Sequence, residues 1–137
     1  CIRDRSIYDA MLLSVDVAHA LHPNKKEKMD ITNMPVMGKG FCIKQACSQS
    51  YATDAQAIAI LCQLCDEKGI PYQRFVNRSD SRGGSTLGSI AGTLLPVKTV
   101  DIGIPILAMH SACELMGVRD MKALSDCVTA FFGYLGK

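Results

Sequence analysis

Three side chains that commonly bind metals stand three residues apart near the start of the chain. Asp16, His19 and His22 follow an apolar run at 11–13, and the remaining histidine, His110, ends a second apolar run. Zinc accepts carboxylate oxygen and neutral imidazole nitrogen, and a catalytic zinc has three protein ligands and one open position. These residues could therefore contribute to a metal site. On spacing alone, the alternative is that the histidines are hydrogen-bonded residues at the core boundary.

A polar turn after residue 78 could meet a substrate. Gly84 lets another backbone approach closely, and Ser85 or Thr86 can cap a following helix. A helix start offers unpaired N–H groups and a positive dipole end, so the turn could hold a carboxylate or a substrate carbonyl. The turn matches neither the P-loop nor the dinucleotide fingerprint, and an ordinary strand-to-helix turn is the alternative.

Longer strings around these residues resemble a known family. The chain is similar to the carboxy-terminal part of the aspartyl aminopeptidases, which are co-catalytic di-zinc exopeptidases. The resemblance covers about residues 11–133 in the family's order and with compatible spacing. It rests on the strings SVDVAHALHPN at 14–24, GFCIK at 40–44, RSDSRGGSTLG at 78–88 and VDIGIPILAMHS at 100–111.

The resemblance implies a role for each candidate residue. Asp16 corresponds to a ligand of one zinc, and His110 to a ligand of the other. His22 belongs to the surroundings of the family's active site, and His19 lies beside it, so both receive supporting roles in substrate binding. Lys44 corresponds to a lysine associated with the acidic side chain of the substrate. The resemblance also favours the substrate-facing interpretation of Gly84, Ser85 and Thr86.

Part of the family's catalytic apparatus is missing from this sequence. The family uses an upstream histidine ligand, a bridging aspartate, and two adjacent glutamates, of which one is the general base. This chain has three glutamates, Glu27, Glu67 and Glu114, and none is next to another. The only adjacent acidic pair, Asp66–Glu67, is expected to be solvated surface. Because the chain also begins at Cys1, we expect a carboxy-terminal fragment of a metalloaminopeptidase, inactive alone, whose partners are the upstream part of the enzyme and an acidic peptide.

Two other interpretations compete with the peptidase. One is a catalytically silent α/β assembly domain without bound metal, because a site that lacks several ligands has little metal affinity. The other is a thiol-dependent enzyme that uses Cys42 or Cys113 with His22 or His110. A C-x-x-C string at 62–65 lies in a helical run without a second cysteine pair, which disfavours a redox or zinc role.

The segments that position these residues alternate between strands and helices. Apolar patterning predicts strands at 11–17, 41–46, 72–77, 98–102 and 104–109, and helices at 53–68, from 85 or 86 to 95, and at 120–135. Thr53 and Gln56 form a capping box, and Gly69 is a natural end for that helix. The pattern predicts one domain over 1–137, an α/β fold with a mostly parallel sheet flanked by helices. The resemblance implies that this domain is the carboxy-terminal part of a zinc-exopeptidase-like catalytic domain.

Composition excludes several other classes. The formal charge is +2, and no aromatic residues interleave with the scattered lysines and arginines, which argues against nucleic acid binding. No apolar run reaches the roughly 20 residues that a membrane span needs. Of the seven cysteines, five lie in largely apolar surroundings, namely Cys42, Cys62, Cys65, Cys113 and Cys127. Free thiols suit a reducing compartment, so we expect a cytoplasmic protein. The family's complete enzyme is expected to carry two zinc ions and to form a homo-oligomer.

Overall fold

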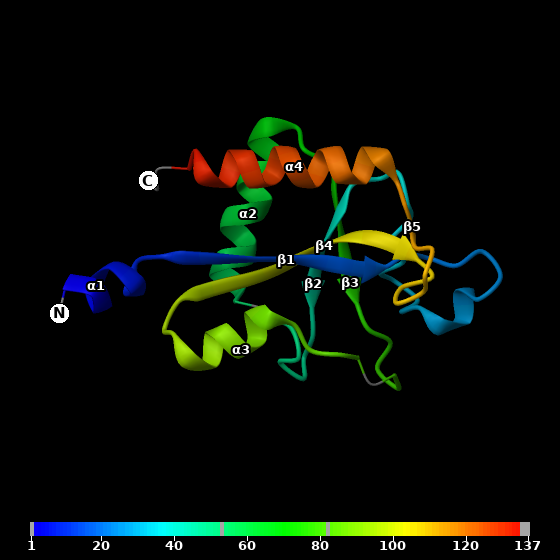
Figure 1. Cartoon of the computed structure of the whole chain (residues 1–137), viewed down its shortest axis with the longest axis horizontal. Coiled ribbons are helices and arrows are strands. Elements are labelled where there is room, and N and C mark those ends of the chain that lie inside the picture. The colour runs from blue at the N-terminus through cyan, green and yellow to red at the C-terminus, as the bar shows by residue number, and fades with distance from the viewer. Residues whose placement is uncertain (1, 53, 82, 135–137) are drawn as a thin grey trace.

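The computed structural model describes residues 2–52, 54–81 and 83–134 (Figure 1). Helices alternate with the strands of one sheet. The helices are α1 (Ile2–Tyr8), α2 (Ala55–Lys68), α3 (Leu87–Leu94) and α4 (Val118–Phe132), with a 3₁₀ turn η1 (Lys26–Lys28). The strands are β1 (Met11–His19), β2 (Phe41–Gln45), β3 (Tyr72–Val76), β4 (Lys98–Leu107) and β5 (Leu115–Met116).

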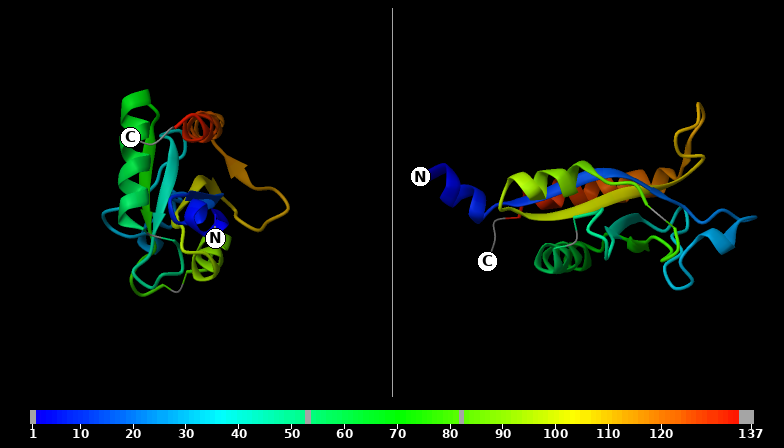
Figure 2. Two further views of the ribbon diagram at one scale, coloured as in Figure 1. Left: turned by 90° about the vertical axis from the view of Figure 1, so that its left-hand side faces the viewer. Right: turned by 90° about the horizontal axis from the view of Figure 1, so that it is seen from below.

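The strands pair in the order β1-β4-β2-β3, and β5 adds to β4. The long β1–β4 ladder and the β2–β3 ladder are parallel, whereas β2 and β5 run antiparallel to β4. Figure 2 shows β1 and β4 side by side along most of their length. The predicted α/β fold with helices flanking the sheet is confirmed, and the sheet is mixed.

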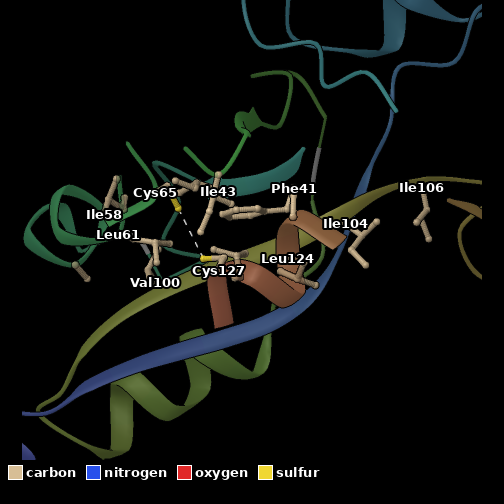
Figure 3. Close-up of a cluster of buried hydrophobic side chains, with 14 residues drawn as sticks. Phe41, Ile43, Ile58, Leu61, Cys65, Val100, Ile104, Ile106, Leu124 and Cys127 are labelled. Atoms are coloured by element: carbon tan, nitrogen blue, oxygen red, sulfur yellow. Dashed lines mark hydrogen bonds between the residues drawn. The ribbon is translucent and has the colours of Figure 1, made fainter. Parts of the chain in front are cut away.

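The two faces of this sheet have different chemistry, because alternate residues of a strand point to opposite sides. Phe41, Ile43, Val100 and Ile102 pack under α2 and α4 in the main apolar core (Figure 3). In the same core the sulfur atoms of Cys65 and Cys127 lie 3.8 Å apart. The opposite face carries the charged side chains, and α3 covers part of it, so α4 and α3 lie on either side of the β1–β4 pair (Figures 1 and 2).

Several predicted elements differ from the observed ones. The two strands predicted at 98–102 and 104–109 form the single strand β4, although Pro105 lies within it. Proline has no N–H to donate, but here it falls between the residues paired with β2, which end at Gly103, and those paired with β5, which begin at Ile106. Pro105 therefore removes no ladder hydrogen bond on the side of β4 that faces β2 and β5.

The helix boundaries also need correction. The capping residue predicted for α2, Thr53, lies outside the described residues, and the side chain of Asp54 accepts the N–H of Ala57 at 2.8 Å. Thr86 is the N-cap of α3, as one of the two predicted alternatives. Helix α4 begins two residues before Asp120, which is fully buried. The sequence patterns did not predict α1 or β5.

Candidate functional site

The carboxyl ends of β1 and β4 enclose a cavity of about 180 Å³. Because these strands are parallel, their ends meet at the same edge, and the turn after β4 lies next to the end of β1. Seven of the eight predicted site residues line this cavity, namely Asp16, His19, Lys44, Gly84, Ser85, Thr86 and His110. The remaining lining residues are Val17, Ala18, Tyr51, Phe75 and Met109.

Lys44 is the buried charge of the cavity, with only 3% of the residue exposed. Its Nζ donates to Asp16 Oδ2 at 3.2 Å and to the Val17 carbonyl at 3.0 Å, and it lies 4.7 Å from the centre of the Tyr51 ring. The side chain of Asp16 is 48% exposed, so water still reaches its carboxylate. A fixed ammonium thus lies beside a hydrated carboxylate at the base of the cavity.

Two imidazoles line the same cavity. Partial burial, the nearby His110 and Lys44 lower the pKa of His19 below its ordinary value, which favours the neutral ring. His110 has a left-handed backbone with φ +68°, and Ala108 two residues earlier has φ +57°. The turn is held by the His110 N–H, which donates to Glu114 Oε1 at 2.6 Å. Such conformations cost free energy and are common at functional sites.

His22 is the one predicted site residue that does not line this cavity. It is exposed, and its Nδ1 accepts the backbone N–H of Asn24 at 3.1 Å. It lines a neighbouring pocket of about 460 Å³, to which His19 and Gly84 also contribute. His22 therefore borders a pocket that shares His19 and Gly84 with the cavity, and its supporting role stays a prediction.

One residue behind the cavity was missed from the sequence. Asp101 is fully buried on β4, and its Oδ2 accepts both the Thr86 hydroxyl at 2.6 Å and the Ala52 N–H at 2.5 Å. The Thr86 hydroxyl is consequently engaged inside the protein rather than offered to a ligand. The available signal was a charged residue in the middle of an otherwise apolar strand.

The donor set matches part of what zinc requires. Asp16 supplies a carboxylate, and His19 and His110 supply imidazoles at one cavity. Within residues 2–52, 54–81 and 83–134, however, no three histidine, cysteine, aspartate or glutamate side chains gather closely enough to hold an ion. The described residues therefore fit a partial zinc site that needs further ligands.

The buried thiols of Cys42 and Cys65 do not provide an alternative nucleophile at the cavity. Burial, reinforced by Asp120, raises the pKa of Cys42 to about 12, so its thiolate is negligible at neutral pH. The thiol-enzyme interpretation therefore fails for Cys42. A hydrogen bond to Cys127, with burial as the second cause, raises the pKa of Cys65, and both side chains belong to the apolar core. Cys113 is exposed, on the turn that follows His110.

Comparison with known proteins identifies the family. The profile described as "Aminopeptidase I zinc metalloprotease (M18)" matches residues 3–132. A "Probable M18 family aminopeptidase 2" of Clostridium novyi (strain NT) is 52% identical over 116 residues, which is 85% of this chain and 27% of that protein. The protein belongs to the M18 peptidase family, as the resemblance to aspartyl aminopeptidases predicted.

Solved structures agree with this assignment. The crystal structure of prApe1 superposes with a TM-score of 0.89 at 27% identity, covering 93% of this chain and 28% of that one. The structure of the S. cerevisiae mApe1 dodecamer superposes with a TM-score of 0.82 at 26% identity, covering 93% and 27%. The chain thus spans less than a third of these proteins. In the part of the chain that the structure describes, no helix is long and apolar enough to cross a membrane.

Proposed function

We propose that this chain is the carboxy-terminal part of a zinc aminopeptidase that removes acidic residues from the N-termini of peptides. The observation that carries the proposal is the buried ammonium of Lys44 in the same cavity as Asp16, His19 and His110. A cation that is fixed by its surroundings can recognise a substrate carboxylate, and the adjacent oxygen and nitrogen donors suit zinc.

In the complete enzyme, Asp16 and His110 would each bind one of two zinc ions. Zinc would supply a polarised carbonyl and a hydroxide at neutral pH. Lys44 donates to Oδ2 of Asp16, and the half-exposed carboxylate would still be able to bind a metal. Lys44 would orient the acidic side chain of the substrate, and Gly84 and Ser85 would border it. His19 and His22 would support the substrate from the rim of the cavity.

The remaining ligands and the general base must come from another segment. Among the described residues, Asp66 and Glu67 are the only adjacent acidic pair, and both are exposed on the last turn of α2, away from the cavity lining. We propose that an upstream part of the same enzyme supplies the missing groups, including a glutamate that moves protons during hydrolysis. The isolated chain would then be inactive even with excess zinc.

The outer side of β1 is where we expect that upstream part to dock. Within the described residues β1 pairs only with β4, so its other edge has free backbone groups. Next to it, a pocket of about 460 Å³ has an apolar wall formed by Leu12, Val15, Leu87 and Ile90. Leu87 is 81% exposed and Val15 is 50% exposed, which is unusual for large apolar side chains that cluster.

We propose further that the complete enzyme is a homo-oligomer in the cytoplasm. The dodecameric state of the S. cerevisiae mApe1 structure supports the first point. The free thiols of Cys42, Cys62, Cys65 and Cys127 support the second, because reducing compartments preserve them. The second candidate function is a silent assembly domain, and the incomplete ligand set favours it over a fragment that works alone.

One experiment tests these proposals together. Native protein recovered through an antibody against this chain should have an intact mass well above 14.8 kDa, contain zinc, and release Asp or Glu faster than Ala or Leu. The recombinant 137-residue chain should release none of them. Zinc-free native protein without peptidase activity would instead establish the silent assembly domain, and strong activity of the isolated chain would refute the need for an upstream part.

A further inference from the structure

Asp101 is a buried carboxylate that the proposed reaction does not use. It lies on the central strand β4, opposite Ser14 of β1 and opposite Lys44 of β2. Directly opposed residues of neighbouring strands share a face of the sheet, so Asp101 and Lys44 lie on the same face. Asp101 is fully buried and does not line the cavity, and therefore it cannot touch a substrate there.

The contacts of Asp101 join two segments that both line the cavity. Its Oδ2 accepts the Thr86 hydroxyl and the Ala52 N–H, and its own N–H donates to the Ala52 carbonyl at 3.3 Å. Thr86 ends the turn that carries Gly84 and caps α3 by accepting the Ser89 N–H. Oδ2 of Asp101 therefore accepts hydrogen bonds both from the Gly84–Thr86 turn and from the segment before α2.

The segment fastened through Ala52 also holds the cation. Tyr51 precedes Ala52, and its ring lies over the Lys44 ammonium, while its hydroxyl accepts from Asn77 at 3.1 Å. Moving Ala52 would carry the Tyr51 ring away from Lys44. Asp101 is thus connected to the proposed substrate cation without contacting a substrate.

A purely structural role explains Asp101 poorly. Its Oδ1 has no hydrogen-bond partner among the described residues, and a buried unsatisfied carboxylate oxygen is unfavourable for stability. This oxygen lies against the first turn of α3, where a Cβ built on Gly88 would approach it to 2.6 Å. The positive end of the helix dipole offsets only part of the cost.

We propose that Asp101 is a positioning residue of the candidate active site. By holding Thr86 and Ala52, it fixes the distance between the Gly84–Thr86 turn and the Tyr51–Lys44 pair, and so sets the space available for an acidic substrate side chain. This inference rests on the proposed aminopeptidase function. It predicts effects on substrate affinity and selectivity rather than on the metal.

Two variants of the full-length enzyme test the inference. Asp101→Asn replaces a charged acceptor by a neutral one, and Thr86→Val removes the hydroxyl that donates to it. Thr93→Val is the matched control, because Thr93 is exposed on α3 and donates only to the Ile90 carbonyl. Both test variants should raise KM for an Asp-headed substrate about five- to tenfold, as expected for the loss of one buried hydrogen bond. The zinc content should match that of the control.

Hydrogen exchange gives a readout that does not depend on activity. The Ala52 amide should exchange faster in Asp101→Asn than in the parent enzyme, because its acceptor is weakened. Faster exchange with an unchanged acidic-to-neutral ratio would reduce Asp101 to a structural residue and overturn the inference. Unchanged exchange would do the same. If Asp101→Asn does not fold, the acidic-to-neutral ratio of the Thr86→Val variant tests the inference instead.

The parent enzyme separates this inference from the proposed function. A parent that binds zinc but cleaves neither acidic nor neutral substrates refutes the proposed function, and this inference with it. A parent that prefers acidic substrates, together with Thr86→Val and Asp101→Asn variants that keep this preference and the parent's KM, refutes only the role of Asp101.

Discussion

Replacing Lys44 by methionine in the full-length enzyme should remove selectivity while leaving the zinc ions in place. Methionine fills the space of the alkyl chain but has no ammonium to meet a substrate carboxylate. A charge-assisted hydrogen bond in a buried site contributes about 1.5–3 kcal/mol. We therefore expect kcat/KM for Asp- and Glu-headed substrates to fall about ten- to a hundredfold.

The same substitution should have a small effect on folding. Removing one partner of a buried ion pair is costly when the other charge stays buried and unpaired. Here the charge left behind is Asp16, whose side chain is 48% exposed, so water can solvate it. The loss should then be in the range of a surface pair, about 0–1 kcal/mol. Thermal unfolding of the enzyme would measure it.

The assay compares initial rates on Asp-, Glu-, Ala- and Leu-headed substrates and the zinc content of each preparation. Lys39→Met is the control, because Lys39 is an exposed lysine on the turn before β2. If the acidic-to-neutral preference survives Lys44→Met, Lys44 is not the residue that recognises the acidic side chain. The Gly84–Thr86 turn would then be the next candidate for that role. A variant that loses its zinc would show that Lys44 acts through Asp16 rather than through the substrate.

Three further predictions concern the chain itself. Burial raises the pKa of Cys42 to about 12. A thiol-alkylating reagent at pH 8 should therefore modify the exposed Cys47 and Cys113 in the folded chain and leave Cys42 unmodified. Peptide mass analysis would measure the modification, and rapid labelling of Cys42 would contradict its burial. Hydrogen bonds from Thr32 and Asn33 lower the pKa of Asp30 from its ordinary 3.8 to about 2, so the loop they form should be fully stabilised above pH 4 and lose this stabilisation as the pH falls toward 2. The amide resonances of Thr32 should report that transition, and a midpoint near 4 would refute it. Gly40→Ala should destabilise the chain by more than about 2 kcal/mol, since Gly40 has φ +104° and a Cβ would lie 2.1 Å from the Pro71 carbonyl oxygen. Gly92→Ala, on α3 where a Cβ meets nothing closer than 4.0 Å, should stabilise it by about 0.5–1 kcal/mol, and urea unfolding of both variants would test the contrast.

The sequence predicted most strands and helices because each has a strong local signal. The apolar run and Gly69 predicted α2, and Thr86 was one of two predicted caps for α3. The two strands predicted at 98–102 and 104–109 are separated only by Gly103, which disfavours a strand locally. Whether a glycine interrupts a strand depends on which neighbours pair with it, and only the assembled sheet decides this.

The candidate site was predictable as far as its residues lie in recognisable strings. Seven of the eight proposed residues line one cavity, and their roles remain predictions. Asp101 lies in the same string as His110, but its importance comes from contacts with Ala52 and Thr86, which are 49 and 15 residues away. The spacing of residues along the sequence cannot predict such contacts. Similarly, the spacing did not show that His22 lines the neighbouring pocket, where its Nδ1 accepts the Asn24 N–H, rather than the cavity itself.

The alternation of side chains along β1 and β4 makes the site vulnerable to insertions and deletions. The side chains of Val17 and Ile104 pack in the core, and Val17 meets the cavity through the carbonyl that accepts from Lys44, whereas the Asp16 side chain lies on the cavity side. A single residue inserted or deleted early in β1 would shift everything after it to the opposite side. Asp16 would then be forced into an apolar layer, and Val17 after a deletion, or Val15 after an insertion, would replace it beside Lys44. Length variation in a family of such enzymes should therefore accumulate in loops such as 20–40, and hardly at all within these two strands.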